Sequence, residues 1–365
     1  MRIETVIIGG GQAGLAMGYH LARRRRPFVI LEANARIGDS WRTRWDSLRL
    51  FSPARYDGLP GMPFPAPPWS FPTRDEFADY LADYADRFDL PVRTGVTVER
   101  LWHDGAGYAV ETAGERFEAD NVVVAAGFDR LPVIPEFAAA LDPGIVALHS
   151  IDYHNPAQLR AGDVLVVGAG NSGADIALEL ARSHRTLLSG RHPGQIPWRI
   201  ERPQARVLTP MVMWAFSHIL TVRTPVGRKL RPRALAHSGP LVRVKSADLA
   251  AAGVERVSRV VGVRDGLPLL ADGRTVDVAN VVWCTGFRPD GRWIDLPGID
   301  AAGDPPQHRG VVDSQPGLYF LGRLFQYALA SSMIRGVGRD AAYIADHLVA
   351  RADRPAAQKL VPSPR

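Results

Sequence analysis

One sequence pattern occurs twice in this chain, at residues 6–23 and again 159 positions later at residues 165–182. In each copy a short apolar segment leads into Gly-x-Gly-x-x-Gly, and a segment of helical character follows. The glycines of this pattern permit a tight turn, let a pyrophosphate approach the backbone, and let the helix pack on the strand. Because both copies have the whole strand–turn–helix pattern, the sequence predicts two dinucleotide-binding βαβ units.

The residues of the two turns are the candidate contacts for the dinucleotides. A second strand is expected after each helix, at residues 28–31 and 186–189, which completes each unit with the phosphate at the helix N-terminus. The turn residues expected to bind the two cofactors are Gly9, Gly11, Gly14, Gly168, Gly170, Ser172 and Gly173.

The residue at the end of the second strand differs between the two copies. Glu32 lies 23 residues after the first glycine of its copy, and the same offset in the second copy falls on Arg191. A carboxylate can accept hydrogen bonds from both hydroxyls of an adenine ribose but repels a 2′-phosphate, whereas a guanidinium binds that phosphate. We therefore predict FAD at the first site and NADPH at the second, with His192 assisting Arg191. NADH remains an alternative at the second site.

The chain of 365 residues is long enough for about two domains. The expected fold class is α/β, with two Rossmann-like dinucleotide-binding domains, one inserted into the other. The FAD-binding domain is expected at residues 1–157 and 285–365, and the NADPH-binding domain at residues 158–284. An apolar strand that ends in small residues and glycine precedes each crossover, so the backbone at Gly127 can lie close to FAD.

A segment at about residues 193–250 does not follow the nucleotide-binding pattern. It has an apolar run at 207–222 with Trp214, followed by the basic stretch 223–233. Three interpretations are open: a buried helix with solvated charges, a lid that shapes a substrate pocket, or an amphipathic contact with a membrane surface. The apolar run is too short and too interrupted to predict a membrane-spanning helix.

The chain has one cysteine, Cys284, which excludes an internal disulfide, a Cys-x-x-Cys pair and a thiolate metal cluster from a single chain. No metal site is predicted. The N-terminus leads directly into an apolar strand without the features of a signal peptide, so the expected location is cytoplasmic.

The formal net charge is +6, and 41 of the 44 basic residues are arginines. The run Arg23 to Arg26 falls at the end of the first helix, where cations complement the helix terminus. We therefore expect a solvated helix end and no nucleic-acid partner. The sequence does not predict the oligomeric state.

Beyond the two loops, further motifs resemble those of the flavin-containing monooxygenase superfamily, particularly its compact bacterial and YUCCA-like branches. The resemblance covers nearly the whole chain. The segments that carry it are Gly9 to Gly14, Gly38-Asp39-Ser40-Trp41, Gly168 to Gly173, Cys284-Thr285-Gly286-Phe287-Arg288-Pro289, Gly317 to Gly322 and Ser331 to Ala341.

The resemblance implies an enzyme in which NADPH reduces FAD and the reduced flavin captures molecular oxygen as a C(4a)-hydroperoxide. An oxygen atom then passes to a small, apolar compound with a nitrogen, sulfur or carbonyl centre. Because the cofactor supplies this chemistry, no side-chain acid or base is assigned as catalytic.

Four residues are expected near the flavin or the linker between domains. The flavin ring is expected near Gly322 and Gln326, and Trp41 either covers it or packs in the core. His149 is expected to hold the linker or position NADPH rather than to act as an acid or base. The segment from Gly144 to His149 has one residue more than the family signature, so an alternative is an NADPH oxidase, a diaphorase or a redox-responsive accessory flavoprotein.

Overall fold

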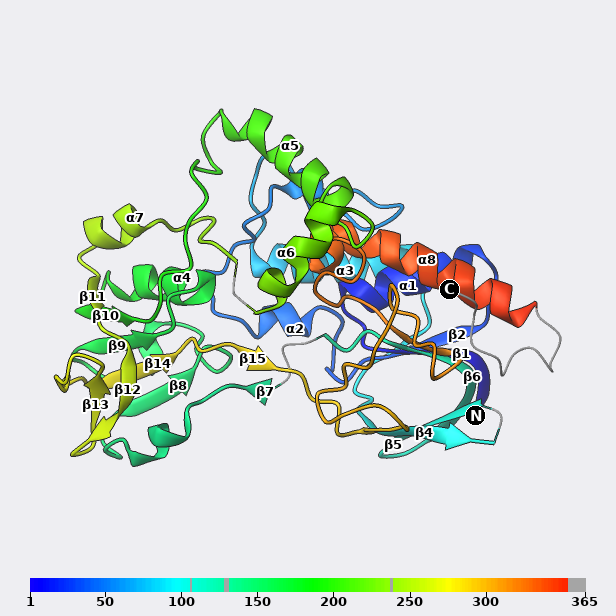
Figure 1. Ribbon diagram of the computed structural model, residues 1–365, viewed down its shortest axis with the longest axis horizontal. Coiled ribbons are helices and arrows are strands. Elements are labelled where there is room, and N and C mark those ends of the chain that lie inside the picture. The colour runs from blue at the N-terminus through cyan, green and yellow to red at the C-terminus, as the bar shows by residue number, and fades with distance from the viewer. Residues whose placement is uncertain (106, 128–130, 237–238, 354–365) are drawn as a thin grey trace.

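The computed structural model describes residues 1–105, 107–127, 131–236 and 239–353, and Figure 1 shows them in two lobes with a sheet in each. Within these residues the first sheet has eight strands, in the spatial order β16 (Ile294–Asp295), β4 (Val98–Asp104), β5 (Gly107–Thr112), β6 (Arg116–Val124), β1 (Arg2–Ile8), β2 (Phe28–Leu31) and β3 (Val92–Arg93), with β17 (Leu318–Phe320) paired to β6. We call the part of the chain built on this sheet the first unit.

β1 lies at the centre of the first unit, because it pairs in parallel with both β2 and β6. Its side chains alternate between two buried layers. Ile7 packs in the layer formed by α1 (Gln12–Arg23) and α8 (Ile334–Ala352), while Val6 and Ile8 pack in the layer of β4 and β5. This is the period of two of a strand that is covered on both faces.

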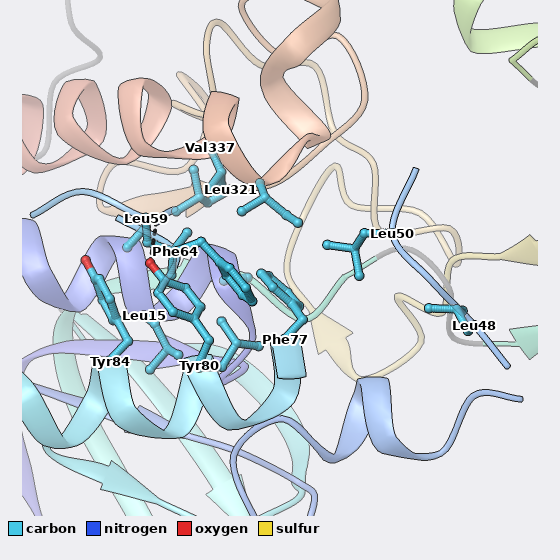
Figure 2. Packing of buried hydrophobic residues seen from close by; sticks show 14 of the residues in the cluster. Leu15, Leu48, Leu50, Leu59, Phe64, Phe77, Tyr80, Tyr84, Leu321 and Val337 are labelled. Atoms are coloured by element: carbon cyan, nitrogen blue, oxygen red, sulfur yellow. Dashed lines mark hydrogen bonds between the residues drawn. The ribbon is translucent and has the colours of Figure 1, made fainter. Parts of the chain in front are cut away.

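An aromatic layer joins α3 (Arg74–Arg87) to the rest of the first unit, as Figure 2 shows. The Tyr80 hydroxyl accepts a hydrogen bond from the Leu59 N–H at 2.6 Å and donates one to the Met62 carbonyl at 2.7 Å. The Tyr84 hydroxyl donates to the Pro60 carbonyl at 2.7 Å. Two buried tyrosines thus hold the irregular segment at residues 59–62 against the helix, since buried hydroxyls need such partners.

The second sheet is parallel throughout, as expected for a βαβ unit. Its described strands follow the spatial order β11 (Glu255–Val257), β10 (Thr186–Ser189), β9 (Val164–Val167), β14 (Asn280–Trp283) and β8 (Val146–His149). The helix α4 (Asn171–Leu180) connects β9 to β10. We call this part of the chain the second unit. The predicted strands at residues 28–31 and 186–189 are both confirmed.

The boundary expected at residue 157 does not coincide with the division between the sheets. β8 pairs with β14 from Val146 to His149 and therefore belongs to the second sheet. Upstream of β8, Phe137 packs edge to face on Trp283 of β14, with ring centroids 6.1 Å apart. The second unit thus begins before residue 146. Of the range 285–365, residues 354–365 lie outside the described part of the chain.

The remaining elements are short or connect the two units. They are α2 (Asp39–Arg42), η1 (Ala54–Tyr56), β7 (Leu131–Pro132), η2 (Glu136–Ala140), η3 (Pro156–Gln158), α5 (Ala205–His218), α6 (Pro225–Ala236), α7 (Ser246–Ala251), β12 (Val260–Arg264), β13 (Leu267–Leu270), β15 (Phe287–Arg288) and η4 (Leu329–Ser332). β7 and β15 pair with each other between the lobes.

Of the insertion expected within the NADPH-binding domain, α5 and α6 pack on the first unit, whereas residues 240–251 pack on α4 of the second unit, where the Val242 N–H donates to Asn171 Oδ1 at 3.0 Å. The turn between α5 and α6 forms a bridge with η4, where the Val222 N–H donates to the Tyr327 carbonyl at 2.8 Å and the Leu329 N–H donates to the Leu220 carbonyl at 2.9 Å. The interpretation of α5 as a buried helix is wrong in part, since several of its large apolar side chains are exposed. Backbone pairing between distant segments determines the position of α5 and α6. Such pairing has no local sequence pattern from which it could be predicted.

The arginine run lies at the end of α1, as expected. α1 ends at Arg23, and two of the three following arginines are paired with acids, Arg24 with Asp346 and Arg26 with Glu4. In the described part of the chain no helix is long and apolar enough to cross a membrane.

Asp57 is a buried acid that follows η1. The Ser52 hydroxyl donates to one of its carboxyl oxygens, and its other oxygen, Oδ2, has no hydrogen-bond partner among the described residues. Burial raises the pKa of Asp57 to about 7. Desolvation disfavours the charged carboxylate, so the folded protein keeps a proton that the unfolded chain releases.

We predict that Asp57→Asn stabilises the protein in a pH-dependent way. Between about pH 4 and pH 7 the folded wild type binds one proton more than the unfolded chain, so its free energy of unfolding falls as the pH rises, by at most about 1.4 kcal/mol per pH unit. The asparagine variant lacks this loss. Its advantage in denaturant unfolding should therefore grow from pH 5 to about pH 8 and stay constant from there to pH 9.

Asp272→Asn is the matched control. Arg274 and Ser258 hold the pKa of Asp272 at about 2, so its effect should not vary over the same pH range. An Asp57→Asn effect that is independent of pH would show that Asp57 is ionised in the folded protein.

Candidate active site

The first glycine loop leaves open space at the N-terminus of α1. Gly9 has φ +109°, and a Cβ there would lie 2.5 Å from the Ala125 carbonyl oxygen; a Cβ at Gly14 would lie 1.9 Å from the Gly9 carbonyl oxygen. A Cβ at Gly11 would meet nothing within 4 Å. Gly9 and Gly14 are therefore required for packing, whereas Gly11 borders a space that a pyrophosphate fits, facing the free N–H groups of the helix.

The second loop repeats this geometry. Gly168 has φ +114°, and a Cβ there would lie 2.1 Å from the Cys284 carbonyl oxygen; a Cβ at Gly173 would lie 1.8 Å from the Gly168 carbonyl oxygen. A Cβ at Gly170 would again meet nothing within 4 Å. Ser172 lies in the first turn of α4 beside this space. Both loops thus fit a dinucleotide phosphate in the same manner.

Glu32 is held rigidly beside the first loop. Its Oε2 accepts from the Gly10 N–H at 2.6 Å, and its Oε1 accepts from the Asn34 backbone N–H at 2.9 Å and from Asn34 Nδ2 at 2.6 Å. A carboxylate offers about four lone-pair positions. Three are used by the protein, so Glu32 can accept one ribose hydroxyl directly, and a second only if Asn34 or Gly10 yields its place.

Arg191 extends into solvent where β10 ends. Gly190 has φ +131° and turns the chain, and the Arg191 side chain is exposed, with no hydrogen bond to another described residue. His192 is fixed: its Nε2 lies 2.8 Å from Ser246 Oγ, and its Nδ1 accepts a backbone N–H two residues on. Arg256 of β11 donates to the Gly190 carbonyl at 2.6 Å, so a second guanidinium lies beside the turn.

The glycines expected near FAD lie at the ends of strands. Gly127 follows β6 with φ +72° and has open space around its Cβ position. Gly322 follows β17 with φ +85°, and a Cβ there would lie 3.2 Å from Ala13 in the first turn of α1. Gly322 is thus next to the first loop, and a side chain there would be strained by its backbone conformation.

Gln326 has a different environment from the one expected. It is buried, its Nε2 donates to the Phe320 carbonyl at 2.8 Å, and its Oε1 accepts from the Arg323 N–H at 3.2 Å. Both ends of the amide are therefore used within its own loop. The geometry favours a role in holding the loop after β17, and a contact with FAD stays a prediction.

His149 lies at the linker between the two units and is almost fully buried. Its Nε2 lies 3.2 Å from the Gly286 carbonyl, and its Nδ1 accepts from the Ile151 N–H at 3.3 Å. The ring packs edge to face on Phe287, with centroids 5.0 Å apart. Burial lowers the pKa of His149, so the ring is neutral and Nε2 is its donor. This arrangement is suited to holding β8 against the segment after β14.

Trp41 belongs to α2 and packs edge to face on Phe77 of α3, with ring centroids 4.8 Å apart. It is half-buried, so the core accounts for one side of the indole only. Arg44 of the same segment places its guanidinium 5.3 Å from the centre of the Phe287 ring. The α2 segment therefore contacts the linker that His149 also contacts.

Cys284 serves the second loop as a packing residue. Its carbonyl oxygen and Cβ lie against the positions where side chains would start at Gly168 and Gly173. Burial raises the pKa of the thiol to about 12, so it stays protonated at neutral pH. A protonated, packed thiol is not a nucleophile or an electron relay.

Several residues that shape the site were not found by the sequence analysis. Asn34 orients Glu32, Arg256 lies beside Arg191, and the buried Tyr153 hydroxyl donates to Glu179 of α4 at 2.7 Å, which ties the linker to the second unit. Only Asn34, two positions after Glu32, carries a local signal. Within the described ranges, no group of three or more His, Cys, Asp or Glu side chains could hold a metal ion.

Comparison with known proteins identifies the family. Residues 6–212 match the family described as pyridine nucleotide-disulphide oxidoreductase. An uncharacterized CzcO-like oxidoreductase of Geobacillus kaustophilus is 37% identical over 95% of this chain and 98% of its own. The probable indole-3-pyruvate monooxygenase YUCCA7 of Arabidopsis thaliana is 30% identical over 78% of this chain and 74% of its own.

Solved structures have the same fold. A flavin-containing monooxygenase from Stenotrophomonas maltophilia has a TM-score of 0.71 at 29% identity, covering 96% of this chain and 99% of that one. The bacillithiol disulfide reductase of Staphylococcus aureus has a TM-score of 0.69 at 16% identity, covering 96% and 99%. Because the Staphylococcus aureus reductase is only 16% identical, its similarity shows a shared fold and not a shared activity.

The chain belongs to the pyridine nucleotide-disulphide oxidoreductase family and to the flavin-containing monooxygenase superfamily. It is an oxidoreductase whose cofactors are FAD and NADPH.

We predict that Gly11→Ala and Gly170→Ala separate the two cofactors. Each adds one methyl group to open space without a clash, so both variants should fold. The methyl group at Gly11 would enter the space that we assign to the FAD pyrophosphate and should lower FAD affinity at least about tenfold. The methyl group at Gly170 should leave FAD bound and raise the KM for NADPH. Flavin absorbance per polypeptide and steady-state kinetics measure the two effects, and a fully yellow Gly11→Ala protein would contradict the first.

We predict that Arg191→Ala raises the KM for NADPH about tenfold to a hundredfold and leaves the KM for NADH nearly unchanged, because NADPH alone carries the 2′-phosphate. Arg191→Lys should restore part of the NADPH affinity. Arg264 is an exposed arginine on β12, and Arg264→Ala is the control for the loss of one positive charge. An equal rise in the KM for NADPH and for NADH in Arg191→Ala would exclude Arg191 as the residue that binds the 2′-phosphate.

Proposed function

We propose that this chain is an NADPH-dependent flavoprotein monooxygenase that oxygenates a small, apolar compound at a nitrogen, sulfur or carbonyl centre. The observation that carries the proposal is the pair of equivalent glycine loops with opposite charges at their ends. Glu32 suits a ribose with free hydroxyls, and Arg191 suits a ribose with a 2′-phosphate. One chain can therefore bind a hydride donor and a flavin at the same time.

The single cysteine argues for an external electron acceptor. A disulfide reductase needs two thiols to pass electrons from the flavin to its substrate. This chain has only Cys284, whose thiol stays protonated and packed beside the second loop. Molecular oxygen with an organic substrate is the acceptor that we propose.

The bound flavin and nicotinamide supply hydride transfer and oxygen activation, and the residues of the chain bind and orient them. The α1 and α4 N-termini would hold the two pyrophosphates, and Glu32 and Arg191 would hold the riboses. Burial lowers the pKa of His149, so its ring is neutral near neutral pH and does not serve as an acid, and its Nε2–H is donated to the Gly286 carbonyl. We propose that it fixes the distance between the units, and that Trp41 shields the flavin side of α2 from water.

The proposed reaction balances with one oxygen molecule. NADPH gives a hydride and the solvent a proton, one oxygen atom is inserted into the substrate, and the other leaves as water. The names of relatives support this class of reaction: YUCCA7 is described as a probable indole-3-pyruvate monooxygenase, and the Stenotrophomonas protein as a flavin-containing monooxygenase. The cytoplasmic location expected from the sequence stays a prediction.

Stopped-flow spectroscopy tests the proposal. Protein reduced with NADPH and then mixed with oxygen should pass through an oxygenated flavin that absorbs differently from oxidised flavin and persists for seconds, whereas free reduced FAD should reoxidise directly. With a panel of apolar amines, thioethers and ketones, at least one compound should be oxygenated with little peroxide released. Direct reoxidation with one peroxide per NADPH, unchanged by every compound, would overturn the monooxygenase and support an NADPH oxidase or diaphorase.

A further inference from the structure

The helix α5 turns its large apolar side chains away from the protein. Val207, Met211 and Trp214 are 66%, 64% and 57% exposed, and their spacing of four and three places them on one face. The opposite face is buried or half-buried and carries Ala205, Thr209, Val212, Met213 and Phe216. The helix thus has large apolar side chains on its inner face and also on its outer face, where a surface helix normally carries polar residues.

This exposed surface extends beyond the helix. A groove lined by Pro210, Met211, Trp214, Ala215 and Ile219 lies along it. The His218 ring stacks on Trp214, with centroids 5.5 Å apart and planes 21° from parallel. Figure 1 shows α5 at the outer edge of the molecule, with α6 between it and α2. We call Val207, Met211, Trp214 and Ile219 the α5 face.

Positive charge is concentrated around the α5 face. Residues 202–247 contain nine basic residues and no acidic residue, while the remaining chain has 35 basic and 38 acidic residues. Two of the nine lie in the second unit, where Arg243 pairs with Asp175 at 3.0 Å and Lys245 is buried, and the other seven lie at residues 202–233. The basic side chains exposed on α5, on α6 and between them include Arg206, Arg223, Arg228, Lys229 and Arg231.

The α5 face is presented by folded backbone. The turn after α5 is bridged to η4 through Thr221 and Ala328, and Arg339 of α8 donates to the Ser217 carbonyl at the end of the helix. A Cβ at Gly227 in α6 would lie 2.0 Å from the Thr221 carbonyl oxygen, so α6 is closely packed on the same turn. The apolar side chains are thus fixed in an outward direction.

We propose that the α5 face docks the enzyme on an anionic lipid surface. The apolar side chains would enter the boundary between headgroups and acyl chains, with Trp214 at the interface, and the surrounding cations would contact lipid phosphates. A second copy of the chain is a poorer occupant, because its α5 face would bring an equally positive segment into contact. In the described residues no helix spans a membrane, so this contact would be peripheral.

Vesicle flotation with the FAD-loaded full chain tests the proposal. The protein should float with vesicles of phosphatidylcholine and phosphatidylglycerol, and several-fold less with phosphatidylcholine alone. High salt should weaken the binding. Equal flotation with both vesicle types would overturn the charge argument, and absence of flotation with either would overturn the proposal.

Two double variants separate the apolar and charged contributions. Met211→Ser with Trp214→Ser, and Arg228→Gln with Lys229→Gln, should each lower binding to the anionic vesicles about tenfold. Val261→Ser with Arg264→Gln changes one exposed apolar and one exposed basic residue on β12 and should bind like the wild type. Equal losses in all three variants would overturn the assignment to the α5 face.

Analytical ultracentrifugation without vesicles completes the test. A monomer, or an oligomer that Met211→Ser with Trp214→Ser leaves intact, agrees with the proposal. An oligomer that this variant dissociates, together with no vesicle binding by the wild type, would show that a second copy covers the α5 face. NADPH oxidation in the absence of lipid should be the same in all variants. A failure of the lipid-docking proposal is therefore distinguishable from a failure of the monooxygenase proposal.

Discussion

Two close backbone crossings at glycine determine the rest of this structure. At the end of β1, the Ala125 carbonyl, which follows β6, occupies the space that a side chain at Gly9 would need. At the end of β9, the Cys284 carbonyl, which follows β14, occupies the space that a side chain at Gly168 would need. A side chain at either crossing would force the strands apart and close the space at the following helix N-terminus. Both units therefore give up side-chain packing at the loop so that a charged, bulky ligand can reach the backbone.

Local features of the fold and site could be predicted from the sequence, whereas features that depend on distant pairing could not. The strands on either side of each loop and the positions of Glu32 and Arg191 follow from spacing along a few tens of residues. The placement of β8 in the second sheet does not, because its pairing with β14 joins segments more than 130 residues apart. Asn34 and Arg256 were missed because their roles arise from contact with Glu32 and with the turn at Gly190.

The linker combines a rigid polar contact with an apolar one. His149 joins β8 to the segment after β14, and Tyr153 joins the linker to α4 through Glu179. The histidine ring and the tyrosine hydroxyl are uncharged near neutral pH, since burial lowers the pKa of the histidine and raises that of the tyrosine. Both contacts hold the linker against the second unit. The first unit contacts the linker through Asp46, whose N–H donates to the His154 carbonyl at 2.8 Å and whose Oδ2 accepts from Asn155 Nδ2 at 2.8 Å.

β6 pairs with β5 along its first half and with β17 along its second half. β1 pairs with the other edge of β6, but the edge that β17 completes stays unpaired during synthesis until residues 318–320 have been made. The strands of the second sheet all lie between residues 146 and 283 and are complete earlier. The sheet of the second unit can thus be completed before that of the first unit, although the glycine loop of the second unit comes later in the sequence.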